Sequence, residues 1–328
     1  MTDIDKIKSK IFKIKSEAEF QDLALNIFEY QYKNVSVYRE FCNFLKTSDV
    51  NSISEIPFLP ISFFKSHKVA DSCTLDDFEI LFKSSGTSAA IRSKHFIYDV
   101  ELYEKSFLKC FKMFFGEPKD YAIFGLLPNY LEQGESSLVY MVDYLIKQSN
   151  CKKSGFYLDN YEDLISEVKL LKEQNHKKII IFGVSYALMD LADFGPSFSD
   201  VIIVETGGMK GRRKELLKED LHNYLKKGFS VKNIYSEYGM TELLSQAYFF
   251  EDSFQTPPWM QVFIRDVNDP KSFLPNDKTG ALNIIDLANI HSCSFIATDD
   301  LGKKTGSDFQ VLGRMDNSDV RGCNLLVN

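Results

Sequence analysis

A short stretch near residue 240 carries residue types that can bind a phosphate and its metal ion. It runs Asn233–Gln246, NIYSEYGMTELLSQ, and a strand-like run there leads into the corner Tyr238-Gly239. A glycine at such a corner lets the backbone approach a ligand closely. Thr241 and Glu242 then open a pattern that predicts a helix. A hydroxyl and a carboxylate at the start of a helix can serve a phosphate and Mg²⁺ together, and the same pair can equally be a plain helix cap.

A second stretch has the composition of a phosphate-binding loop. The run 78–82, FEILF, predicts a strand that leads into Lys83–Ser93, KSSGTSAAIRS. Small hydroxyl residues around a glycine form a loop whose N–H and O–H groups can surround phosphate oxygens. The spacing of a Walker loop is absent, and many such loops are ordinary turns. The interpretation therefore depends on other stretches that point to the same ligand.

The middle of the chain alternates between strand-like and helical patterns. Strands separated by helices of this length imply a largely parallel sheet with helices on both faces, and ligands of such sheets gather at the carboxyl ends of the strands. Three glycine corners fall at such ends: Gly183, Gly207-Gly208 and Tyr238-Gly239. The predicted strands are 121–127, 178–184 and 201–206, and the predicted helices are 136–148, 163–174 and 215–227.

The two ends of the chain differ from the middle. Residues 1–50 predict amphipathic helices, and the proline-punctuated run 56–65 predicts a connector. After residue 250, strand-like runs at 261–267, 280–287, 292–302 and 308–316 predict an antiparallel meander or a small barrel. There Asp300 is expected at a strand end, where it could accept both hydroxyls of a ribose, and Arg314 after a further strand, where it could pair with a phosphate. Ordinary hairpin turns are the alternative interpretation.

Composition narrows the class of protein. The 328 residues carry a net charge of −7, which argues against a general nucleic-acid binder. The six cysteines have no CxxC spacing and no signal peptide precedes them, so we expect reduced thiols in a cytoplasmic protein. The five histidines form no zinc-binding pattern, and no apolar run is long enough to span a bilayer.

Taken in order, four of these stretches resemble the adenylate-forming superfamily of acyl- and aryl-CoA ligases. The run 84–88, SSGTS, is similar to its phosphate loop, and Gly207-Gly208 to its adenine-side turn. The run 238–242, YGMTE, is similar to its aromatic-Gly-x-Thr-Glu motif, and Thr298–Gly302 with the run 313–316, GRMD, to its ribose and hinge motifs. The resemblance covers residues from about 80 to the end.

A narrower resemblance is to the LuxE-type acyl-protein synthetases, the long-chain-fatty-acid–protein ligases. The stretches that carry it are IPFLPISFFKSHKV, FGLLPNYLEQGESSLVYMV, TGGMKGRRKE, SEYGMTELLSQAY and RGCNLLV. Members of this family activate a fatty acid with ATP to an acyl-adenylate. They pass the acyl group to a cysteine and then to an acyl-reductase partner. The resemblance thus implies ATP, Mg²⁺, a fatty or other carboxylic acid, and a reductase or acyl-carrier partner.

The resemblance also implies a role for each matching residue. Ser84, Ser85, Gly86, Thr87 and Ser88 would hold the β- and γ-phosphates of ATP. Thr241 would contact the α-phosphate, Glu242 would ligate Mg²⁺, and Tyr238 with Gly239 would lie against adenine beside Gly207 and Gly208. Asp300 would take the ribose hydroxyls, assisted by Arg314. Such a reaction needs alignment and charge neutralisation more than acid–base groups.

The fold expected from the resemblance is the α/β N-terminal-domain fold of the adenylate-forming enzymes. A single adenylating domain, 1–328, would comprise a helical segment with its connector (1–80), an α/β sheet region (81–250) and a β-rich subdomain (251–328). The superfamily's C-terminal lid domain is expected to be absent. Ala89 stands where the superfamily loop usually has glycine, and Arg92 near its usual lysine.

Cys323 is the predicted acyl acceptor, because a thiolate that attacks an acyl-adenylate gives a thioester. Arg321 could lower the pKa of that thiol, and Cys293 is a weaker candidate. A packed apolar cysteine is the alternative interpretation. Two other functions stay open: a free-standing ligase that delivers an acid to CoA or a carrier protein, and a non-catalytic subunit that serves as a scaffold.

Overall fold

Residues 3–72, 77–85, 91–127, 135–158, 160–174, 177–207 and 216–315 are described in the computed structural model. The chain divides into unit 1, which joins Met1–Leu75 to Pro258–Asn328, and unit 2, which is Asp76–Pro257. The boundaries of the units lie close to residues 80 and 250, where the sequence changes character. That the whole chain acts as a single adenylating domain stays a prediction.

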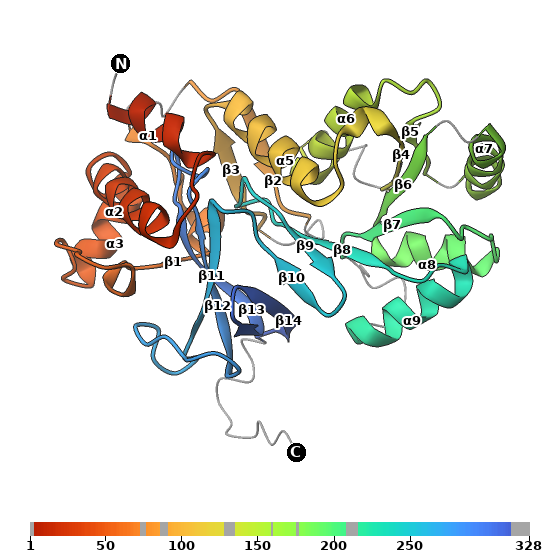
Figure 1. Ribbon diagram of the computed structural model, residues 1–328. Helices are drawn as coiled ribbons and strands as arrows, with labels where there is room; N and C mark the ends of the chain where they lie inside the picture. Colours follow the sequence, from red (N-terminus) through yellow and green to blue (C-terminus); the bar gives the residue numbers. More distant parts are fainter. Residues whose placement is uncertain are drawn as a thin grey trace. The chain divides into compact units, whose positions relative to one another are not determined.

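The N-terminal part of unit 1 is helical, as predicted, with α1 (Asp3–Ile11), α2 (Glu17–Asn34) and α3 (Ser36–Phe44). The start of α2 is fixed by Ser16, whose side chain accepts a hydrogen bond from the amide of Glu19. Phe20, Leu23 and Ile27 repeat at helical spacing and are buried, so one face of α2 packs inward. Figure 1 shows these helices in red to orange.

The proline-rich connector is irregular, as expected. It contains a 3₁₀ turn, η1 (Ile53–Glu55), a short strand β1 (Leu59–Pro60) and a single helical turn α4 (Phe63–Ser66). Strand β1 pairs in parallel with a strand of the C-terminal part of unit 1, with Leu59 opposite Ile296. The buried ring of Phe58 lies 5.8 Å from the ring of Phe273. The connector is therefore held to the core of unit 1 by side-chain packing and by backbone pairing.

The C-terminal part of unit 1 is an antiparallel meander, which confirms one of the two predicted arrangements. Its strands are β11 (Met260–Arg265), β12 (Thr279–Asp286), β13 (Phe295–Thr305) and β14 (Asp308–Arg314), and each pairs with the next. The prediction that Asp300 lies at a strand end is wrong, because β13 continues for several residues beyond it. Likewise, Arg314 is the last residue of β14 rather than a residue after it.

The sheet of unit 2 is largely parallel, as the alternating pattern predicted. Strands β4 (Tyr121–Leu126), β5 (Gly155–Phe156), β6 (Lys178–Gly183), β7 (Val201–Glu205) and β8 (Tyr235–Tyr238) stand in the order β8-β7-β6-β4-β5. All of these neighbours pair in parallel. Two antiparallel strands, β9 (Ala247–Phe250) and β10 (Ser253–Gln255), extend the sheet beyond β8. A separate hairpin joins β2 (Ile80–Lys83) to β3 (Lys94–Ile97).

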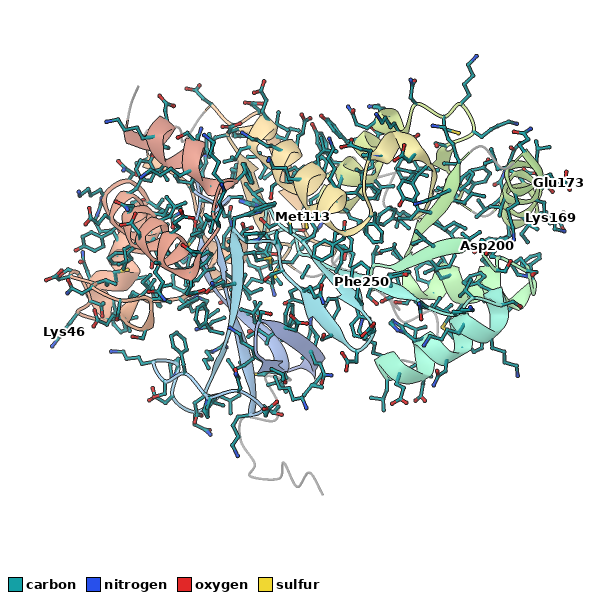
Figure 2. The ribbon with its side chains drawn as sticks, in the orientation of Figure 1. Lys46, Met113, Lys169, Glu173, Asp200 and Phe250 are labelled. Carbon is teal, nitrogen blue, oxygen red and sulfur yellow. The ribbon has the colours of Figure 1, made fainter. Side chains whose placement is uncertain are left out.

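Helices cover both faces of this sheet. The helices are α5 (Val100–Phe114), α6 (Ser137–Ser149), α7 (Tyr161–Gln174), α8 (Ser185–Asp193) and α9 (Lys218–Phe229), with a 3₁₀ turn η3 at Pro118–Asp120. Figure 1 shows α5 and α6, in yellow, on one side of the strands and α8 and α9, in green, on the other. Lys169 and Glu173, labelled in Figure 2, lie on the exposed side of α7. No helix of the described residues is long and apolar enough to cross a membrane.

Candidate functional site

The segment after β8 is a turn, so the helix predicted to start at Thr241 and Glu242 is wrong. The amide of Leu243 donates to the carbonyl of Met240, and the chain then enters the antiparallel strand β9. Helix α5 holds the next residues extended, since Ser106 bonds to Ser245 at 3.0 Å and the thiol of Cys110 to the carbonyl of Gln246 at 3.2 Å. Glu242 is only 4% exposed, while Thr241 is half-buried.

His95 joins this turn to the hydroxyl-rich loop. Its ring atom Nδ1 lies 2.7 Å from the carbonyl oxygen of Thr241. Because a carbonyl can only accept, Nδ1 must carry the proton and donate. His95 is on β3, the strand that leaves the loop, and its side chain is 1% exposed. The strand that follows the hydroxyl-rich loop and the turn at Thr241 are therefore neighbours in unit 2, and the sequence analysis did not predict this contact through His95.

Charged side chains fasten the base of the hydroxyl-rich loop. The amide of Ser93 donates to the hydroxyl of Ser84 at 2.9 Å, and the guanidinium of Arg92 donates to the carbonyl of Ser84. The carboxylate of Glu135 pairs with the ammonium of Lys83 and lies 3.5 Å from Arg92 Nη1. Arg92 is thus engaged with the loop base. Ser85 is exposed, and the predicted phosphate ligands Gly86, Thr87 and Ser88 lie outside the described residues.

The predicted glycine corners do fall at the ends of neighbouring strands. Gly183 is the last residue of β6, Gly207 follows β7, and Gly239 follows β8. The backbone of Gly207 has φ +75°, a conformation that favours glycine. The amide of Thr206 donates to the carbonyl of Gly183 at 3.0 Å, so the first two corners are hydrogen-bonded together. Gly208 lies outside the described residues.

Glu205 organises this end of the sheet, and the sequence analysis missed it. Its buried carboxylate accepts hydrogen bonds from the amide of Gly207 at 2.6 Å and from the hydroxyls of Ser185 and Ser236. The ammonium of Lys218 lies 3.7 Å away. These partners come from the turn after β7, from α8, from β8 and from α9. A carboxylate so well bonded tolerates its burial. It holds the Gly207 turn in place.

Two further titratable groups belong to the Glu205 network. His222 Nε2 lies 2.9 Å from the Ser236 hydroxyl, and its ring packs edge-on against Phe249. Burial, together with the charge of the nearby Lys218, lowers the pKa of His222 to about 4. Burial also lowers the pKa of Lys218, whereas the nearby carboxylate of Glu205 acts in the opposite direction and raises it. The Lys218 ammonium stands 4.6 Å from the centre of the Phe254 ring.

In unit 1, Asp300 and Arg314 are paired across β13 and β14. Arg314 Nε lies 3.1 Å from Asp300 Oδ1, and the two residues are opposite each other in the register. The Asp300 amide donates to the hydroxyl of Thr298 at 3.1 Å, which fixes the strand there. The side chain of Asp300 is 10% exposed, whereas that of Arg314 is 83% exposed. The carboxylate of this ion pair is therefore mostly buried, whereas the guanidinium side chain is mostly exposed to solvent.

Three of the described cysteines are buried and are therefore poor nucleophiles. Cys42, Cys110 and Cys293 are buried, and burial raises the pKa of Cys42 to about 12 and the pKa of Cys293 still higher. Cys293 lies in the loop just before β13, so its predicted place inside a strand is wrong. Cys151 is half-buried. The favoured acceptor Cys323, with Arg321, lies outside the described residues.

Glu242 stays the predicted magnesium ligand. Mg²⁺ in phosphate sites is bound through one or two carboxylates together with phosphate oxygens and water, rather than by an all-protein cage. The described residues contain no group of three or more metal-binding side chains. The buried carboxylate of Glu242, next to the Thr241 hydroxyl in a turn at the strand end, fits such a site.

Comparisons with solved structures identify the fold. A 2-hydroxyisobutyryl-CoA ligase, in the postadenylation state with its acyl-AMP, superposes with a TM-score of 0.70 at 10% identity, covering 94% of this chain and 70% of that one. MatB from Rhodopseudomonas palustris gives a TM-score of 0.51 at 15% identity, covering 73% of this chain and 48% of that one. At these identities the likeness shows the fold alone. The predicted α/β fold of the adenylate-forming ligases is confirmed.

Sequence comparisons identify the family. The long-chain-fatty-acid–luciferin-component ligase of Vibrio harveyi is 26% identical over 336 residues, which cover 92% of this chain and 85% of that protein. The family described as LuxE, acyl-protein synthetase, matches residues 8–102 and 135–328. These two segments include the hydroxyl-rich loop, the Tyr238–Glu242 turn, Asp300 with Arg314, and Cys323. The chain therefore belongs to the LuxE family of acyl-protein synthetases and is an AMP-forming acid ligase.

Proposed function

We propose that this chain activates a fatty acid with ATP and Mg²⁺ and transfers the acyl group to a protein cysteine as a thioester. The observation that carries the proposal is the bond between His95 and the carbonyl of Thr241. It brings the hydroxyl-rich loop and the Thr-Glu turn together in unit 2, so both can act on one polyphosphate.

In the first step, a carboxylate oxygen of the acid attacks the α-phosphorus of ATP and pyrophosphate leaves. Ser84, Ser85, Gly86, Thr87 and Ser88 would hold the β- and γ-phosphates, and Thr241 the α-phosphate. Glu242 would ligate Mg²⁺, which neutralises charge that develops on the leaving group. The chain's own contribution is alignment, because His95 and the fastened base of the loop keep both motifs in fixed positions.

The residues proposed to hold the nucleoside are those that match the family's motifs. The ring of Tyr238 and the corners at Gly207, Gly208 and Gly239 would contact adenine, and Asp300 would accept hydrogen bonds from the ribose hydroxyls. The fixed conformation of Gly207 supports the adenine role, since a backbone without Cβ lets the ring approach. The exposure of the Arg314 side chain supports a role in binding a phosphate.

In the second step, the Cys323 thiolate would attack the acyl carbonyl and AMP would leave, which forms the thioester. The burial of Cys42, Cys110 and Cys293 supports this choice, because a buried thiol neither ionises readily nor reaches a substrate. The acyl group would then pass to an acyl-reductase partner. The name of the Vibrio harveyi relative, a luciferin-component ligase, supports a partner that consumes a fatty acyl group.

Acid-dependent exchange of labelled pyrophosphate into ATP tests the first step. We expect exchange with a long-chain fatty acid and Mg²⁺, and none when either is omitted. The Thr241→Val variant, which keeps the volume and loses the hydroxyl, should reduce exchange strongly. Ser166→Ala on α7 is the matched control, because Ser166 is exposed and bonds only within its own helix. Absence of exchange across a range of acids would favour the scaffold instead.

A further inference from the structure

Glu237 has a carboxyl group for which the proposed roles give no use. It is the third residue of the four-residue strand β8 and is half-buried. Glu205, on the neighbouring strand, is saturated with hydrogen bonds, as described above. No hydrogen bond or ion pair reaches the carboxyl of Glu237 from the described residues. Burying a carboxyl group without hydrogen-bond partners costs free energy, unless a ligand supplies the missing hydrogen bonds.

The carboxyl of Glu237 points along the strand toward the Thr241 turn. A Cβ built on Gly239 would lie 2.3 Å from Glu237 Oε1, and its next contact beyond that residue is Gln246 Cγ at 3.5 Å. Glycine at position 239 therefore leaves the space into which this carboxyl folds. The carboxyl thus lies beside the corner that precedes Thr241, the residue assigned to the α-phosphate.

The surroundings of Glu237 are aromatic and disfavour its charge. Tyr248 of β9 stands opposite Glu237 in the pairing of β8 with β9. Tyr103 of α5 is also close to Glu237, and the Tyr103 ring lies 5.9 Å from the ring of Tyr140 on α6. The hydroxyl of Tyr248 is buried without a partner among the described residues. Burial, together with the negative charge of Glu205 on β7, raises the pKa of Glu237 to about 8. At neutral pH the group is thus mostly a protonated donor.

We propose that the carboxyl of Glu237 is a substrate ligand that donates a hydrogen bond to one oxygen of the acid's carboxylate. The other oxygen attacks the α-phosphorus, the bond from that phosphorus to the departing pyrophosphate breaks, and Glu237 keeps its proton throughout. An ionised side chain here would repel both the acid and the triphosphate, whereas a neutral donor orients the acid. The inference rests on the proposed adenylation.

The test is the pH profile of fatty-acid-dependent pyrophosphate exchange between about pH 6 and pH 9.5, compared for three variants. Glu237→Gln keeps a neutral donor at every pH. Glu237→Leu removes the donor at similar volume. Glu162→Gln, on the exposed side of α7, is the matched control. Titration of Tyr103 or Tyr248 would persist in all three, so a change confined to position 237 identifies the group.

For the wild type, we expect kcat/KM for the acid to fall about tenfold per pH unit above an apparent pKa near 8. Glu237→Gln should keep activity within about threefold at pH 7 and lose this alkaline fall. Glu237→Leu should raise the KM for the acid about tenfold or more and leave the KM for ATP nearly unchanged. Glu162→Gln should behave as the wild type.

Two results would overturn the inference while the proposed function stands. One is a Glu237→Gln variant whose alkaline fall matches that of the wild type. The other is a folded Glu237→Leu variant, with a normal unfolding transition, whose acid KM is unchanged. If the wild type itself shows no acid-dependent exchange, the proposed function fails, and the inference fails with it.

Discussion

The imidazole of His95 and the carbonyl of Thr241 are 2.7 Å apart, although 146 positions separate the two residues. The bond is short enough to fix the strand after the hydroxyl-rich loop against the turn after β8. Since the side chain of His95 is almost fully buried, water cannot replace the donor if the ring is removed. The His95 side chain therefore contributes to the relative position of the two segments.

Removal of the His95 ring should impair catalysis more than stability. We expect His95→Ala to lose about tenfold to a hundredfold in kcat/KM for pyrophosphate exchange, because a buried bond of this kind is worth about 1–3 kcal/mol. His95→Asn, whose amide can donate at nearly the same place as Nδ1, should recover most of that loss. Equal losses in the two variants would show that ring packing, and not the bond to Thr241, is what matters.

Glu242→Gln tests the metal role. The amide keeps the shape of the side chain and loses its charge, so Mg²⁺ should be held less tightly. We expect kcat/KM for exchange to fall about a hundredfold or more, with partial recovery at high Mg²⁺. Glu251→Gln is the control, since Glu251 is exposed at the far end of β9. A Mg²⁺ dependence that is the same in Glu242→Gln and the wild type would assign the metal to another residue.

Asp300 and Arg314 should respond differently to substitution. Asp300→Asn loses the charge that would hold the ribose hydroxyls, so the KM for ATP should rise about tenfold or more. Arg314→Ala breaks an ion pair whose base is mostly exposed, and the stability of the protein should change by less than about 1 kcal/mol. Unfolding in urea and the KM for ATP measure the two effects separately. An unchanged KM in Asp300→Asn would remove it from the nucleotide site.

The Glu205 network should make stability depend on pH. His222 has a folded-state pKa of about 4 against an ordinary value of 6.5. Between these values the unfolded chain binds more protons, so stability is full above about pH 6.5 and is lost as the pH falls toward 4, by at most about 3 kcal/mol. Glu237, with its raised pKa, acts in the opposite direction. The effect of His222 is therefore the difference between the wild type and His222→Gln in urea titrations.

In that comparison, His222→Gln should show a weaker loss of stability on acidification than the wild type. Its amide can still bond to Ser236, which preserves the packing. Parallel stability curves for the two proteins would show that His222 is already protonated, or not titrating, in the folded protein.

The sequence predicted the parallel sheet because its strands are continuously apolar and its helices have clear periodicity. Helix α8 was not predicted: it has no side-chain cap and is apolar nearly all round. At Thr241–Gln246 the apolar spacing favoured a helix, but Ser106 and Cys110 of α5 fix the segment in an extended form. Such a tertiary contact has no local signal. The positions of Asp299 and Asp300 within β13 were missed because polar residues inside a strand and polar residues of a hairpin turn are alike in composition.

The candidate site was predictable only in part. Glycine, hydroxyl and acidic residues at strand ends are visible in a sequence, and these gave Thr241, Glu242 and Asp300. His95, Glu205 and Glu237 were not predicted, because their importance comes from burial and from partners distant in the chain. A histidine within a short strand has no distinguishing pattern by itself. A glutamate at the end of an apolar strand, as in the run 201–205, is the one signal that could have pointed to Glu205.

The central claim, acyl transfer to Cys323, is tested most directly by intact-protein mass spectrometry. Wild type and Cys323→Ala would each be incubated with ATP, Mg²⁺ and a mixture of fatty acids. We expect the wild type to gain the mass of one acyl group, removable by neutral hydroxylamine, and Cys323→Ala to gain none while it still exchanges pyrophosphate. An adduct that persists in Cys323→Ala would contradict the assignment. Release of AMP without any adduct on the wild type would contradict acyl transfer to this chain.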